Sequence, residues 1–196
     1  MRRTSSASAP PPTPTAPRRS ATPSIEHGAF MDEGVIPEMV ARGTAYVPTL
    51  SSVIAIAYRH KVAGSTDMYE AIMTDIVGRH MDSVRMAWAA GVPVATGTDT
   101  NGEVVEELEL LAEATGANPL DVLPAATSVA AEVVGLGGTT GVLEPGLAAD
   151  VVVDGDVRAG FEALWRPRWG VRDGVVFDGA PMPLGLRLTE MRAAQG

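Results

Sequence analysis

The residues best suited to chemistry are one histidine and one aspartate, each placed after a short apolar stretch. His27 lies at the end of residues 24–27, and Asp99 follows the apolar run 92–98. An imidazole and a carboxylate suit a divalent metal such as zinc. A carboxylate beside a metal-bound water can also take the proton of that water as hydroxide attacks a polarised carbonyl. By spacing alone a structural alternative stays open, in which His27 bonds a backbone group and Asp99 caps the next loop.

The other polar residues point less clearly to a site. We expect His80 on or near the apolar face of a helix, as a satisfied core or interface histidine, and His60 in a solvated loop. Residues 97–102 (GTDTNG) could be a phosphate loop, but they lack the glycine spacing and the lysine of one. The acids in 103–109 are expected to form the solvated face of a helix. With no cysteine, disulfides, thiolate zinc sites and a cysteine nucleophile are excluded.

Alternating strand and helix patterns would position His27 and Asp99. The predicted strands cover 24–28, 45–50 and 92–98, and the predicted helices cover 32–42, 76–90, 104–114, 119–126 and 128–134. Residues 51–74 are ambiguous and are expected to be a loop with some helix. This order predicts right-handed βαβ units and a parallel sheet, whose strand ends open onto one shared mouth.

After Gly135 the pattern changes to short strands and turns. Residues 138–146 predict a strand and a turn, 149–154 a β-branched strand, and 171–177 a hairpin turning at Asp173-Gly174. We therefore expect a small β element at the end of the chain.

The beginning of the chain and the overall charge limit the functions open to the protein. Residues 1–23 hold four arginines, six prolines and no acid, which predicts a disordered leader, with a targeting peptide as the alternative. The net charge of −9 argues against nucleic-acid and anionic-membrane partners. No apolar run approaches the ~18–20 residues of a membrane-spanning helix. We expect a cytoplasmic protein.

Several sequence motifs, taken together, resemble the metal-dependent amidohydrolase superfamily, in particular its imidazolonepropionase-like and prolidase-like members. Residues 24–28 (SIEHG), 47–50 (VPTL) and 89–99 (AAGVPVATGTD) are similar to the sixth, seventh and eighth strands of its barrel. Residues 120–128 (LDVLPAATS), 141–146 (GVLEPG) and 149–153 (ADVVV) are similar to its helices after the barrel and its returning β-sandwich strands. The resemblance covers about 24–178 and implies an α/β chain with the last three strands and helices of a (β/α)8 TIM-like barrel, followed by a small β-sandwich segment.

The resemblance also implies an activity and a site. It implies hydrolysis of amide, lactam or peptide-like carbon–nitrogen bonds in a small molecule, with a divalent metal, zinc first, as cofactor. By position, His27 would bind the metal or the substrate, and Asp99 would be metal ligand and general base. Thr98 and Asn101 lie beside Asp99 and are candidates for substrate contact.

The chain departs from the family pattern in ways that keep a second function open. It contains no His-x-His pair, and Leu147 stands where the family has a basic residue. Two protein ligands are fewer than the three or four of zinc sites. We therefore expect a leader (1–23), the C-terminal sector of a barrel (24–134) and β-sandwich return strands with a tail (135–196). Such a truncated chain would need a complementing chain or a homo-oligomer for catalysis. The alternative is a catalytically inactive remnant or a partner-binding fragment, and a nucleotide-binding module is a third, weaker hypothesis.

Overall fold

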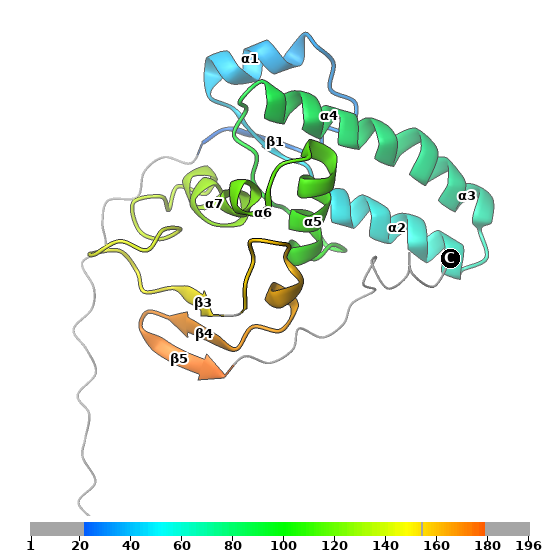
Figure 1. The fold of residues 1–196 in the computed structure, drawn as a ribbon. Helices are drawn as coiled ribbons and strands as arrows, with labels where there is room; N and C mark the ends of the chain where they lie inside the picture. The colour runs from blue at the N-terminus through cyan, green and yellow to red at the C-terminus, as the bar shows by residue number, and fades with distance from the viewer. Residues whose placement is uncertain (1–21, 154, 179–196) are drawn as a thin grey trace, which may run out of the picture.

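The first two described strands form a short parallel sheet (Figure 1). A computed structural model of the protein describes residues 22–153 and 155–178, so nearly all of the predicted leader and the end of the tail lie outside the described residues. Strand β1 (Ser24–Glu26) pairs in parallel with β2 (Ala45–Val47), with Ser24 opposite Ala45 and Glu26 opposite Val47. The predicted parallel pairing of these segments is confirmed.

The third predicted strand is reduced to one bridged residue. Tyr46 of β2 pairs in parallel with Val94; the Tyr46 amide donates to the Pro93 carbonyl (2.8 Å) and the Ala95 amide to the Tyr46 carbonyl (2.9 Å). The pairing ends there because the Thr96 amide turns away to the Ala125 carbonyl (2.8 Å). The order of the paired segments is nevertheless β1, β2, Val94, and all three segments run in the same direction.

Helices follow each of these segments. They are α1 (Val35–Arg42), α2 (Leu50–Val62), α3 (Thr66–Ala71), a π-helical turn (Ile72–Val77), α4 (Gly78–Ala89), α5 (Val104–Thr115), α6 (Pro119–Val122), a 3-10 turn (Leu123–Ala126) and α7 (Ser128–Val133). The strand–helix alternation makes this part of the chain an α/β structure.

The expectation of a loop at 51–74 is wrong, because this segment is almost entirely helical. In α2 the side chains of Ile54, Ala57 and Tyr58 are buried at helical spacing, and α2 lies beside the long α3–α4 helix (Figure 1). His60 consequently lies in the last turn of α2 and is half-buried, rather than in a solvated loop.

The C-terminal part forms a three-stranded antiparallel sheet. Strand β3 (Val151–Val153) pairs with β4 (Trp169–Arg172), and β4 with β5 (Val175–Asp178). The predicted turn is confirmed, since Asp173 and Gly174 both have positive φ (50° and 76°), as a type I′ turn requires. Residues 138–146 form turns and no strand, which corrects that expectation. The second sheet that a sandwich needs is not among the described residues.

The core joins these helices to the segment before β4. Its fully buried members include Leu50 and Ile54 of α2, Val84 of α4 and Leu111 of α5. None of the described helices has the length and apolarity needed to cross a membrane.

Candidate active site at the strand ends

Three strained backbone positions mark the carboxyl end of the parallel sheet. His27 (φ 64°), Thr49 (φ 59°) and Asp99 (φ 48°) adopt the left-handed region, and each follows one of the three parallel segments. Among the described non-glycine residues, only Asp173 in the hairpin turn shares this property. Left-handed backbone costs of order 1–3 kcal/mol outside glycine, is least expected for a β-branched residue such as Thr49, and clusters at functional sites. This strain singles out the rim as the candidate site.

The His27 side chain is exposed, and hydrogen bonds to residues 46–49 hold the residue in place. Its Nδ1 lies 2.8 Å from Thr49 Oγ1. Its amide donates to the Val47 carbonyl (2.9 Å) and its carbonyl accepts from Tyr46 Oη (2.9 Å). Within the described part of the chain, no hydrogen bond is made to Nε2. His27 thus has one ring nitrogen occupied by β2 and the other available at the surface.

Tyr46 supports this turn from beneath the rim. It is fully buried, and its hydroxyl also donates to the Gly28 carbonyl (3.1 Å). Burial first, and then the nearby Glu107 carboxylate, raise the pKa of Tyr46 well above its ordinary value, so the phenol stays a neutral donor. A Cβ on Gly28 would lie 2.9 Å from Tyr46 Cε2, so glycine is the residue that fits here.

His80 is a buried histidine next to the main chain of His27. It is buried in α4, as expected for a core histidine, with the main chain of His27 and Pro48 facing its ring. The expectation that its ring is satisfied is not met, since neither nitrogen makes a hydrogen bond to a described residue. Burial lowers the pKa of His80 to about 4, so the ring is neutral at neutral pH.

Asp99 lies on a loop that packs against the end of β2. A Cβ on Gly97 would overlap the Val47 side chain and lie 3.2 Å from Thr49 Cγ2, while one on Gly102 would lie 2.8 Å from the Ser52 amide. The loop is therefore anchored on both sides of Thr49, and the Asp99 carboxylate is exposed between those anchors. His27, Thr49 and Asp99 share one rim.

The remaining predicted site residues make local contacts only. The Thr98 carbonyl accepts from the Gly102 amide (2.9 Å), and Asn101 Nδ2 donates to Thr100 Oγ1 (3.0 Å). Both side chains are half-buried. A substrate-binding role for Thr98 and Asn101 stays a prediction.

Sequence reasoning missed Glu107, which corrects the expectation of a solvated acidic face on α5. Its side chain is fully buried, and its two oxygens accept from the Leu50 amide (3.0 Å) and the Ser51 amide (2.7 Å) at the start of α2. Burial raises the pKa of Glu107 to about 7, against the hydrogen bonds from Thr49, Leu50 and Ser51 that favour the carboxylate. The sequence carried a signal for this burial, because Glu107 is four residues before the apolar Leu111 and therefore shares a helix face with it.

The described residues do not by themselves complete a zinc site. Nowhere in residues 22–153 and 155–178 do three histidine, aspartate or glutamate side chains come together as a metal-binding group. Structural and catalytic zinc sites take three or four protein ligands. His27 and Asp99 therefore fit as part of a ligand set and not as a whole one.

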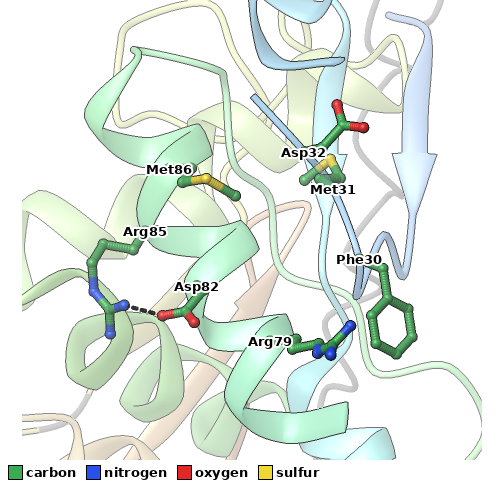
Figure 2. A pocket seen from close by; sticks show the side chains of 7 residues that line it. All are labelled: Phe30, Met31, Asp32, Arg79, Asp82, Arg85 and Met86. Carbon is green, nitrogen blue, oxygen red and sulfur yellow. Dashed lines mark hydrogen bonds and ion pairs between the residues drawn. The ribbon is translucent and has the colours of Figure 1, made fainter. Parts of the chain in front are cut away.

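A cavity of about 550 Å³ lies outside this rim, between the segment after Gly28 and α4 (Figure 2). It is lined by Phe30, Met31, Asp32, Arg79, Asp82, Arg85 and Met86. The Arg79 guanidinium lies 5.6 Å from the Phe30 ring, and Arg85 is paired with Asp82. None of the predicted site residues lines the cavity, so it is separate from the candidate active site.

The fold and the rim define an α/β chain with a candidate site at the carboxyl ends of parallel strands. The model of the amidohydrolase family matches residues 18–180. The chain belongs to the amidohydrolase family.

The chain matches only part of the length of each relative. The chain is 36% identical over 132 residues to ochratoxinase from Aspergillus niger, which is 66% of this chain and 27% of that protein. The crystal structure of that ochratoxinase aligns with a TM-score of 0.63 at 27% identity, covering 82% of this chain and 38% of the other. The chain thus spans about a quarter of the length of this relative.

Solved structures extend the likeness. A putative prolidase from Bifidobacterium longum aligns with a TM-score of 0.74 at 28% identity, covering 89% of this chain and 46% of the other. A zinc-bound adenosine deaminase from Xanthomonas campestris aligns with a TM-score of 0.56 at 17% identity, covering 87% and 40%, and shares the fold alone.

Proposed function

We propose that the chain is part of a metal-dependent hydrolase that cleaves amide, lactam or peptide-like carbon–nitrogen bonds of a small molecule. The observation that carries the proposal is the placement of His27 and Asp99 at the ends of the two parallel segments that flank β2, in a member of the amidohydrolase family. The ochratoxinase and prolidase likenesses support this substrate class.

The proposed roles follow from exposure and bonding. The exposed Asp99 carboxylate has an oxygen available to take the proton of an attacking water. His27 presents Nε2 because Nδ1 is held by Thr49. Thr98 and Asn101 flank Asp99 and are proposed to contact the substrate. The family resemblance implies a divalent metal, with zinc as the proposed ion; His27 and Asp99 would be two of its ligands, and further ligands would have to come from outside the described residues.

Hydrolysis assays on the protein test the proposal directly. We expect turnover of Xaa-Pro dipeptides or N-acyl amino acids after incubation with zinc, and a loss of at least about 100-fold in kcat/KM in Asp99→Asn and His27→Gln. Asp67→Asn is the matched control, because Asp67 is an exposed acid on α3, away from the rim. Full activity in Asp99→Asn would rule out the assigned base.

A second candidate function is binding without catalysis. It is favoured by the lack of a group of three metal-ligating side chains among the described residues. In that case neither turnover nor zinc binding at micromolar concentration would be detected, and dye binding would report exposed apolar surface. A complementing chain or a homo-oligomer, the domain boundaries and the cytoplasmic location stay predictions.

A further inference from the structure

Thr49 is the residue of the rim with no assigned role and the least expected backbone. It is 3% exposed, β-branched, and held at φ 59°. Its hydroxyl is the described group that contacts the His27 ring, at 2.8 Å from Nδ1. We propose that Thr49 is a positioning residue that fixes the orientation of the His27 ring by occupying Nδ1 and leaves Nε2 as the nitrogen presented at the mouth. The inference deepens the proposed function and rests on it, since it is there that His27 binds a metal or a substrate.

The surroundings of Thr49 hold it in its strained conformation. The Glu107 carboxylate accepts from the amides of the next two residues, Leu50 and Ser51. The Thr49 carbonyl accepts from the Ser52 amide at 3.1 Å, within the first turn of α2. Gly97 lies against the Thr49 side chain, since a Cβ on Gly97 would lie 3.2 Å from Thr49 Cγ2. A β-branched residue keeps such a backbone only where its neighbours over-determine it, so the position of Oγ1 is fixed before any ligand arrives.

The contact restricts which ring nitrogen reacts. In a neutral imidazole one nitrogen carries the proton and the other is an acceptor, and the partner of one nitrogen decides the role of the other. When Nε2 binds an electrophilic or proton-donating ligand, Nδ1 carries the proton and donates it to Thr49 Oγ1. A hydroxyl can also donate to Nδ1, so the contact is kept when no ligand is bound. In both states Nδ1 is occupied by Thr49.

The second hydroxyl of this strand end fixes the main chain of the same residue. Tyr46 Oη donates to the His27 carbonyl (2.9 Å) and to the Gly28 carbonyl (3.1 Å). With the backbone fixed by Tyr46, the ring of His27 keeps rotation about its own side-chain bonds only. The Thr49 contact removes that remaining freedom.

Nitrogen-15 NMR of the full chain, labelled at histidine, tests the proposal without metal. The protein has three histidines, so His60 and His80 serve as internal references in the same spectrum. We expect Thr49→Val to change the shift of His27 Nδ1, because the hydroxyl bonded to that nitrogen is lost, and to leave the shifts of His60 and His80 in place. Valine keeps the β-branch and the backbone strain, Thr49→Ser should restore the original shifts, and Thr44→Val is the control for a threonine outside the rim. Unchanged His27 shifts in Thr49→Val would overturn the proposal.

Two further arms keep the outcome decisive. If Thr49→Val does not fold, Thr49→Gly removes the same hydroxyl and relieves the left-handed strain, and it should give the same change in the His27 Nδ1 shift. Titration with zinc chloride should move Nε2 of His27 in the original protein, with an affinity about 10-fold higher than in the hydroxyl-free variant. If zinc moves neither nitrogen, the proposed metal function fails, and the metal-free spectra still decide the role of Thr49.

Discussion

At the scale of the residue, the rim depends on a glycine next to the candidate ligand. Gly28 has φ 54°, and a Cβ there would lie 2.9 Å from Tyr46 Cε2, whereas Gly43 has φ 63° with nothing within 4 Å. Both glycines would suffer the same left-handed strain on substitution, and only Gly28 would also displace the Tyr46 ring.

Alanine at these two positions separates the two costs. Gly43→Ala should lower the free energy of unfolding by about 1 kcal/mol, and Gly28→Ala by about 1–3 kcal/mol more, because a well-packed neighbour must move. Urea unfolding measures both. Equal losses in the two variants would show that Tyr46 yields without cost and does not hold the turn.

Single residues also show how far the sequence could be interpreted. His27 and Asp99 could be predicted because their motifs are local in the chain. Thr49 and Tyr46 could not be predicted, since both act through hydroxyl contacts to His27 at the end of the neighbouring strand β1. At Thr49 the role also depends on a backbone angle that no propensity predicts. Glu107 was misassigned because an acid among acids is normally solvated.

At the scale of the element, α5 supplies the acceptors for the start of α2. Glu107 accepts from two amides there, so its removal should loosen the first turn of α2 and with it Thr49. In Glu107→Gln one of the two acceptor oxygens becomes an NH2 group, so a donor faces an amide donor. The substitution should lower the free energy of unfolding by about 1–3 kcal/mol. Glu113→Gln, exposed on the same helix, is the control and should change it little.

The same side chain gives a pH dependence of known sign. The pKa of Glu107 is raised from 4.5 to about 7 in the folded protein, so between these values the folded state holds a proton that the unfolded state has lost. Stability from this group is complete below about pH 4.5 and is lost as the pH rises through about 7. The stability difference between the original protein and Glu107→Gln should therefore narrow from pH 4.5 to 7, as measured by urea unfolding at several pH values. A widening difference would contradict the raised pKa.

Elements also show where sequence patterns fail. Strands β1, β2 and β3 and the Asp173-Gly174 hairpin have short-range signals, and the structure bears these out. The strand expected in 138–146 is not formed, and the one expected at 92–98 is reduced to the bridge at Val94. The segment 51–74 has no clear apolar period. Helix α2 buries Ser51 and Ser52 as well as its apolar residues, because other parts of the chain pack against more than one of its sides.

At the scale of the whole molecule, two aromatic residues connect the C-terminal segment to the helices. Phe161 and Trp165 are each 3% exposed and belong to the core, and Trp165 Nε1 donates to Glu109 Oε1 of α5 (3.0 Å). The segment before β4 should therefore unfold together with α5 rather than independently.

Truncation of Trp165 tests this coupling. Trp165→Ala should cost about 3–5 kcal/mol and lower the melting temperature of the helices, followed by circular dichroism. Trp169→Ala is the control, since Trp169 is 41% exposed. Unaltered melting of the helices in Trp165→Ala would show that the C-terminal segment is an independent unit.

The antiparallel sheet has a practical consequence for purification. Val152 and Phe177 flank Gly170 on one face and Val176 lies on the other, and these three side chains are 62%, 54% and 63% exposed. Exposed apolar side chains on both faces of this single sheet favour binding to phenyl resins. They also favour precipitation of the native protein at low ammonium sulfate concentration.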